Sequence, residues 1–280
     1  MPAAGTALAG SVRGSVSEWL RTVGQWAVFI AQTLWFLPLT VRHYRRQILV
    51  AMNGLAWGRG SIIVDGGVLS VLLIMGTAMG ASVAIEAYST LNLIGFGALS
   101  GIVGGVANVR EMAPIVTGIA FAIQVGCRMT AEIGSMRISE EIDTTEAMGL
   151  RPIPFVVGTR LIGALLCVIP GYFIVLTASF YIAHAVVAVF RGQPSGTYNH
   201  YFVQFLSPTD IGYSLTKAAV FCVLVTLIHC YYGYFAHGGP VGVGQASGRA
   251  VRASLVTIVV VNFTLTVAMW GLRPEFVFKG

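Results

Sequence analysis

The chain has 280 residues, of which 56% are hydrophobic and 10% are charged, whereas soluble globular domains carry roughly 25% charged residues. This composition excludes an ordinary soluble domain and predicts an all-α polytopic membrane protein. The net charge of +6 does not indicate nucleic-acid binding, because the basic residues are not interleaved with aromatic residues on a polar surface.

The first predicted element is an amphipathic helix over residues 17–36, with Trp19, Trp26 and Trp35 on its apolar stripe. Such a stripe is typical of a helix that lies in the membrane interface. A helix buried against the rest of the protein would show the same pattern. The basic stretch VRHYRRQ, residues 41–47, follows, and it suits either anionic headgroups or a solvated loop. No cleavable signal peptide is expected before these elements.

Apolar stretches long enough to cross about 30 Å of hydrocarbon come next. They predict five spans, at about residues 66–88, 93–127, 161–190, 211–235 and 253–271. The second contains Arg110 and Glu111, followed by Pro114, so we expect a glycine-rich half, a polar break and a second half. Pro170 predicts a kink in the third span.

The distribution of Lys and Arg predicts the orientation of the chain in its membrane. With a cytoplasmic N-terminus, that face receives twelve of the seventeen basic residues and the opposite face receives three. Arg110 and Lys217 remain in or near the membrane. We therefore expect the N-terminus in the cytoplasm and the C-terminus on the opposite side of the membrane.

A charged segment between the second and third spans predicts a cytoplasmic helix over about residues 132–148. Gly149 and Pro152 supply its stop signals. Its partly apolar face would contain Ile138, Ile142, Thr145 and Met148, and its acidic face Glu140, Glu141, Asp143 and Glu146. A permease driven by a separate ATPase needs such a stiff element to receive the motion of the motor. A solvated helix that only keeps two spans apart would look the same.

Arg110 and Glu111 are candidates for a lipid path, because a charge at mid-membrane costs about 2.5–3.5 kcal/mol on insertion scales. We expect Glu86 to lie close enough to join them. They would form the polar rim of a cavity that holds a lipid tail. Met75 and Met79 are candidate lining residues, since thioethers adapt to variable tails. The alternative is a structural ion pair inside a broken helix. Glycine pairs such as Gly76 with Gly80 predict close helix packing rather than chemistry.

Motifs for catalysis and metal binding are missing from the sequence. The sequence contains no HExxH, GxSxG or GxxxxGK[ST], and the four cysteines form no CxxC pair. We expect buried thiols, a non-catalytic transport subunit and no cofactor or metal in this chain. ATP and Mg would be bound by a partner ATPase.

Several motifs together resemble the MlaE/YrbE family of ABC transporter permeases. These are REMAP at 110–114, TAEIGSMRISEEID at 130–143, EAMG at 146–149 and SGRAVRASL at 247–255. The chain is most similar to the B-type YrbE subunits of actinobacterial and mycobacterial Mce lipid transport systems. The resemblance implies an N-terminal segment, residues 1–47, and a permease domain, residues 48–280.

The resemblance also implies partners and residue roles. The partners would be a cytoplasmic ABC ATPase, a second YrbE-type permease, MCE-domain proteins on the outer side and a lipid such as a fatty acid or sterol. The residues expected to engage the ATPase are Glu132, Arg137, Glu140, Glu141, Asp143 and Glu146. The residues expected along the lipid path, Glu86, Arg110, Glu111, Met75 and Met79, are chosen from their own chemistry rather than from the resemblance.

Departures from the family pattern favour a heterodimer of two different permeases. Gln124 stands where members often have arginine, and Arg128 follows about one turn later. Glu86 and Glu141 stand where many members have glutamine. Two other functions stay open: an ion-coupled secondary lipid transporter or channel, and a membrane scaffold without transport. Only one broken span is found, whereas secondary transporters typically show paired broken helices in two related halves.

Overall fold

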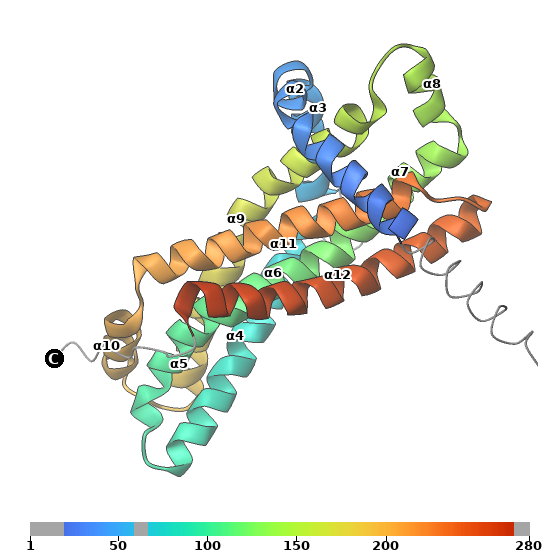
Figure 1. Cartoon of the computed structure of the whole chain (residues 1–280). Coiled ribbons are helices and arrows are strands. Elements are labelled where there is room, and N and C mark those ends of the chain that lie inside the picture. Colours follow the sequence, from blue (N-terminus) through green and yellow to red (C-terminus); the bar gives the residue numbers. More distant parts are fainter. Residues whose placement is uncertain (1–19, 59–66, 272–280) are drawn as a thin grey trace, which may run out of the picture.

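The computed structural model describes residues 20–58 and 67–271 (Figure 1). The regular elements within these ranges are helices, which confirms the predicted all-α polytopic class. Residues 17–19 of the first predicted helix and residue 66 of the first span lie outside the described residues. The same holds for four of the basic residues that predicted the orientation, Arg13, Arg59, Arg273 and Lys279.

Five long helical segments within the described ranges are apolar enough to cross a membrane. They are Val68–Leu93 (α4), Gly97–Ile138, Ile153–Phe190, Pro208–Tyr234 (α11) and Gly239–Trp270 (α12). The second and fifth extend well beyond the predicted spans. Hydropathy detects only the part of a helix that suits hydrocarbon, whereas backbone hydrogen bonding continues into polar sequence.

The second and third segments are composites of shorter elements. The second contains η1 (Gly97–Leu99), α5 (Ser100–Ala107), η2 (Asn108–Met112), α6 (Ala113–Phe121), η3 (Ala122–Gly126) and α7 (Cys127–Ile138). The third contains η4 (Ile153–Gly158), α9 (Thr159–Ala185) and η5 (Val186–Phe190), and α9 continues through Pro170. The polar break expected at Arg110 is a π-helical turn, η2, so the chain stays helical there.

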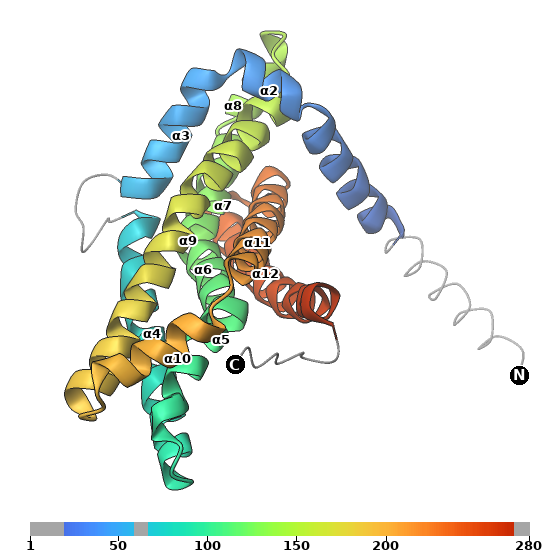
Figure 2. The same ribbon diagram turned by 90° about the vertical axis from the view of Figure 1, so that its left-hand side faces the viewer.

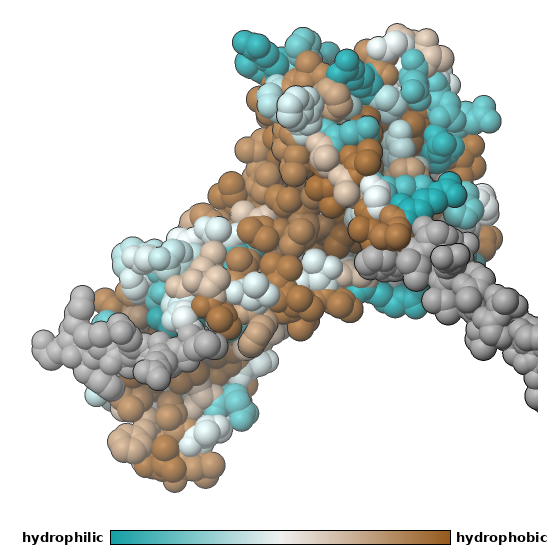
Figure 3. Space-filling model, in the orientation of Figure 1, coloured by the Kyte–Doolittle hydropathy of each residue, from teal (hydrophilic) through white to brown (hydrophobic). Residues whose placement is uncertain are grey.

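Shorter helices occupy the two ends of the bundle (Figures 1 and 2). Helices α2 (Leu37–His43), α3 (Arg45–Trp57) and α8 (Glu141–Ala147) lie at one end, which we call the α8 end. Helix α10 (Ser195–Phe205) and the turn between α4 and α5 lie at the other. Hydrophobic residues dominate the surface between these ends, and polar residues gather near α2 and α8 (Figure 3). This arrangement is that of a multi-pass membrane protein.

The helix over residues 20–35 is packed on one side and exposed on the other. Trp26 stacks on Tyr231 at 3.7 Å between ring centroids, and Phe29 is 2% exposed. Leu34 and Trp35 remain exposed, Trp35 by 81%. One face of this helix therefore packs on α11, and the other carries exposed apolar side chains. Its position in the membrane interface stays a prediction.

Glycines permit a close approach between α4 and α9. A Cβ on Gly76 would lie 2.9 Å from the carbonyl oxygen of Val175, and one on Gly80 would lie 2.6 Å from Cα of Ser179. The neighbouring atoms belong to backbone, which cannot move without separating the helices. Small residues at these positions therefore set the distance between α4 and α9.

Replacing Gly80 by alanine is expected to destabilise the protein by about 1–3 kcal/mol, the usual cost of overpacking. Gly212→Ala on α11 is the matched control, because a Cβ there meets nothing within 4 Å. The midpoint of thermal unfolding in detergent measures the effect. Equal midpoints for the two variants would contradict the proposed role of Gly80.

Candidate functional site

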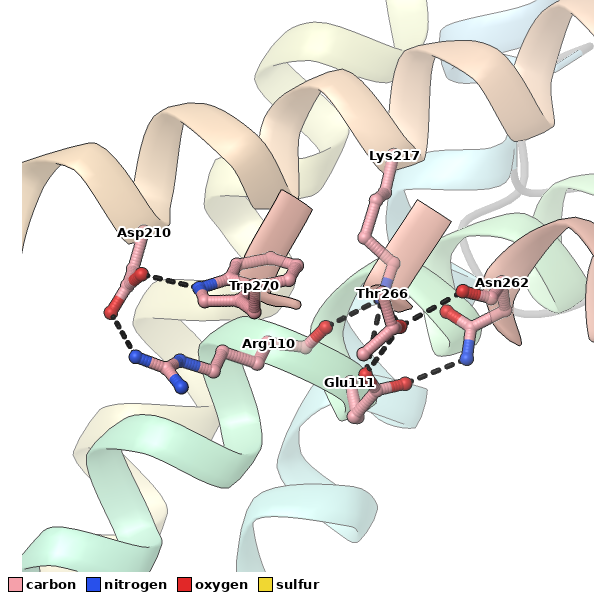
Figure 4. A network of polar contacts seen from close by, with 7 residues as sticks. All are labelled: Arg110, Glu111, Asp210, Lys217, Asn262, Thr266 and Trp270. Carbon is pink, nitrogen blue, oxygen red and sulfur yellow. Dashed lines mark hydrogen bonds and ion pairs between the residues drawn. The ribbon is translucent and has the colours of Figure 1, made fainter. Parts of the chain in front are cut away.

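A network of polar side chains joins three of the long apolar helical segments (Figure 4). Its members are Arg110 and Glu111 from η2, Asp210 and Lys217 from α11, and Asn262, Thr266 and Trp270 from α12. Residues about 100 to 155 positions apart in sequence meet here. The two candidates from the second span are thus brought together with residues from the last two spans.

The buried ammonium group of Lys217 lies at the centre of this network. Its Nζ donates to the carbonyl oxygen of Arg110 at 2.7 Å, and its side chain is 0% exposed. In a regular α-helix that carbonyl would accept from the amide of residue 114, but Pro114 has no N–H. Lys217 therefore supplies a donor to a carbonyl that the sequence leaves without its usual partner.

Glu111 accepts hydrogen bonds from both of the last two spans. Its Oε1 lies 3.3 Å from Nζ of Lys217 and 2.7 Å from Oγ1 of Thr266. Its Oε2 accepts from Nδ2 of Asn262 at 2.6 Å. A carboxylate with three donors is well satisfied, which offsets the cost of placing it among apolar helices.

A second ion pair lies next to the first. Arg110 Nη2 and Asp210 Oδ2 are 3.1 Å apart, and Trp270 Nε1 donates to Asp210 Oδ1 at 2.6 Å. The Arg110 guanidinium also lies 5.4 Å from the centroid of the Trp270 ring, within the range of a cation–π contact. Trp270, the last residue of α12, therefore contacts both members of this second ion pair.

The formal charges of this network cancel, with two basic and two acidic side chains. Glu111 is 31% exposed and Arg110 is 26% exposed, whereas Lys217 is fully buried. Lys217 therefore holds the three helical segments together from inside, and the carboxylate and guanidinium present polar atoms at the surface of the bundle. Such an edge can bind a polar headgroup, or it can serve only to join the helices.

Sequence patterns predict only part of this network. They place Lys217 in or near the membrane without a partner, and they do not distinguish Asp210. Their spacing of seven residues puts both on one face of α11, which is a detectable signal. Asn262, Thr266 and Trp270 carry no comparable signal, because polar and aromatic residues are common along membrane helices.

Other lipid-path candidates lie apart from this network. Glu86 is exposed on α4, and its Oε1 accepts from Thr90 at 3.4 Å rather than contacting Arg110 or Glu111. Met75 and Met79 are partly buried against the hydrophobic core. These three residues therefore stay predictions, without support from the contacts of the described residues.

The segment predicted as one cytoplasmic helix over residues 132–148 is divided between two helices. Helix α7 ends at Ile138 and α8 begins at Glu141, and Glu140 between them has φ +58°, in the left-handed region. This left-handed residue ends the regular helix and changes the direction of the chain between α7 and α8. The predicted stop is present, because α8 ends at Ala147 and Gly149 has φ +80°.

The division also separates the predicted apolar face. Ile142 is 1% exposed and Thr145 is 7% exposed, so these two pack inward. Ile138 and Met148 are 41% and 67% exposed. Exposed apolar side chains beside a cluster of carboxylates form a surface suited to a protein partner.

One ion pair holds α8 against α7. Arg137 Nη1 lies 2.6 Å from Oδ1 of Asp143, and its guanidinium lies 6.0 Å from the ring centroid of Tyr234 at the end of α11. Glu140, Glu141 and Asp143 remain exposed. We call the exposed surface of Arg137 to Met148 the acidic turn.

Glu132, also expected to engage the ATPase, faces another direction. Its Oε1 lies 2.8 Å from Nε of Arg128, and its Oε2 lies 3.5 Å from Nη2 of Arg160 on α9. It lines a groove with residues of α3 and α9 rather than the acidic turn. These interactions do not support the predicted contact of Glu132 with the ATPase.

Comparisons with known proteins agree with the architecture. The family model described as "Permease MlaE" matches residues 61–268. A probable ABC transporter permease protein of Rickettsia bellii is 29% identical over 188 residues, which cover 67% of this chain and 72% of that protein. A probable ABC transporter permease protein of Synechocystis sp. is 29% identical over 265 residues, covering 92% and 94%. The chloroplastic protein TRIGALACTOSYLDIACYLGLYCEROL 1 of Arabidopsis thaliana is 28% identical over 202 residues, covering 71% and 57%.

Proposed function

Because the chain belongs to the MlaE permease family, we propose that it is the membrane subunit of an ABC-type lipid transporter of the Mce class. A separate ATPase would bind and hydrolyse ATP with Mg. The subunit itself would be a transport component rather than an enzyme, and it would need no cofactor of its own. Relatives described as probable ABC transporter permeases support the ABC class.

The acidic turn gives the proposal its main structural support. It is the part of the α8 end that combines exposed carboxylates with exposed Ile138 and Met148, and Arg137 fixes it to two helices. A rigid attachment is what a motor requires, since a loose loop would absorb the motion instead of passing it to α7. We propose this surface as the site where the ATPase docks.

We propose that the polar network lies beside the lipid path. Glu111 and Arg110 would meet the headgroup, and the apolar surfaces of the spans would hold the tails. The path would form between this chain and a second, different YrbE-type permease. MCE-domain proteins would receive or deliver lipid at the end that carries α10. The membrane would be the inner membrane of a bacterium, with α8 in the cytoplasm.

Transport by the reconstituted complex tests the proposal against its main alternative. The chain, its ATPase and a second permease are placed in proteoliposomes that hold a fluorescent fatty acid or sterol, with or without a proton gradient. ATP-dependent transport that persists after an ionophore removes the gradient is expected. An ion-coupled secondary transporter would stop when the gradient is lost, even with ATP present. A scaffold would move no lipid under either condition.

A further inference from the structure

A second polar site lies at the α8 end, apart from the network around Lys217. It is a groove of about 630 Å³ between α3, α7 and the start of the third span. Helix α3 runs alongside α9 here (Figure 2). The charged residues of its lining are three arginines, Arg46, Arg128 and Arg160, and one acid, Glu132, so two positive charges are in excess.

Two of the three guanidinium groups are held in place by other protein groups. Arg128 Nε pairs with Glu132, and its Nη1 donates to the carbonyl oxygen of Gly54 on α3 at 3.0 Å. Arg160 Nη1 donates to the carbonyl oxygen of Val156 at 2.9 Å, and its Nη2 lies 3.5 Å from Glu132. Glu132 is shared between both arginines, so it balances only one of the two charges. A fixed pair of guanidinium groups is preorganised for an anion.

Arg46 adds a third cation to the lining of this groove. It has no ion pair or hydrogen bond with any other residue in the described ranges, and it is exposed. Arg46 stands next to Gln47, which also lines the groove. Its guanidinium is therefore available to a ligand that already contacts Arg128 and Arg160.

The apolar surface next to these arginines indicates what kind of anion fits. Val50 lines the groove and is 66% exposed. Leu49 and Trp57, elsewhere on α3 and outside the lining, are also exposed. Met136 and Phe155 continue the apolar lining inside. A free phosphate ion or an acidic protein segment would contact the arginines but would leave this apolar surface exposed. A molecule with a phosphate at one end and an acyl chain at the other uses both parts.

We propose that this groove binds one anionic phospholipid from the leaflet at the α8 end. The phosphate contacts Arg46, Arg128 and Arg160, and an acyl chain follows Val50 and α3. The site is separate from the proposed lipid path, and its occupancy does not depend on transport.

Native mass spectrometry of the full-length chain, purified with its partner subunits and stripped of lipid, tests the proposal. Phosphatidylglycerol is titrated against phosphatidylcholine as the neutral comparison. Wild-type protein is expected to bind phosphatidylglycerol more tightly. Arg46→Gln is expected to weaken that binding about tenfold, the effect of one lost charge-assisted hydrogen bond. Arg46 is exposed, so this change leaves the fold intact.

Arg252→Gln is the matched control, because Arg252 is an exposed arginine of α12 that does not line the groove. It should bind phosphatidylglycerol as the wild type does. Two results would overturn the proposal: equal affinity for the two lipids, or equal phosphatidylglycerol affinity in the Arg46 and Arg252 variants. Loss of the ATPase from Arg46→Gln with unchanged lipid affinity would instead assign the groove to a protein partner.

Discussion

Replacing Glu140 and Asp143 together by lysine is expected to abolish co-purification of the ATPase while the protein still inserts into the membrane. Both carboxylates are exposed on the acidic turn, so their reversal repels a basic docking surface. At about 2 kcal/mol for each lost contact, two contacts correspond to an affinity loss of roughly a thousandfold. Affinity purification of the tagged chain, followed by quantification of the bound ATPase, measures this loss.

Glu86→Lys provides the control for the change of charge. Glu86 is an exposed carboxylate on α4, far along the chain from the acidic turn, and its recorded contact is with Thr90. This variant should retain the ATPase. The midpoint of thermal unfolding separates lost docking from local damage, because the double variant also removes the ion pair of Asp143 with Arg137. Undiminished ATPase binding by the double variant would refute the docking role of the acidic turn.

Replacing Lys217 by methionine is expected to destabilise the protein by about 3–5 kcal/mol. The change removes the donor to the Arg110 carbonyl and leaves the Glu111 carboxylate without its cation. Methionine has a similar shape, so the loss reflects charge and hydrogen bonding rather than a cavity. Unfolding in detergent, by heat or by denaturant, measures the change in stability.

A double variant, Lys217→Met with Glu111→Gln, separates a structural role of the network from a role in transport. Removing both charges leaves no unpaired ion, and one of the two donors, Thr266 or Asn262, can still donate to the single amide oxygen of residue 111. Most of the lost stability should therefore return. If the lipid path includes Glu111, transport stays low although the protein is stable. Recovery of both stability and transport would show that the network only joins helices.

Much of the architecture could be predicted because membrane spans are a local property of the sequence. About 20 consecutive apolar residues are enough to predict a crossing, and all five predicted spans coincide with long helices. The bounds were less accurate, since Gly239 to Arg252 is helical although its composition does not suit hydrocarbon. The motifs around Arg110 and Glu132 likewise indicated the family before any contact was known, and the family model confirms it.

The division of the segment over residues 132–148 could not be predicted from its helical pattern. The spacing of Ile138, Ile142 and Met148 fits one continuous helix, but the helix is interrupted at Glu140, which has a positive φ. With this interruption, Ile142 packs into the core and Arg137 reaches Asp143. Contacts with the rest of the bundle thus outweighed a local preference for uninterrupted helix.

The sequence by itself determined the class of protein, the number of crossings and the family, because these depend on composition and on short motifs. Only the tertiary structure decided which partners the charged side chains contact. Lys217 donates to the carbonyl oxygen of Arg110 and pairs with Glu111. Glu132 pairs with Arg128 and Arg160, whereas Glu86 contacts Thr90 and neither Arg110 nor Glu111. An ion pair in a membrane helix has several possible partners at the same depth. Which of them it meets depends on how the helices are rotated and packed, and no local stretch of sequence contains that information.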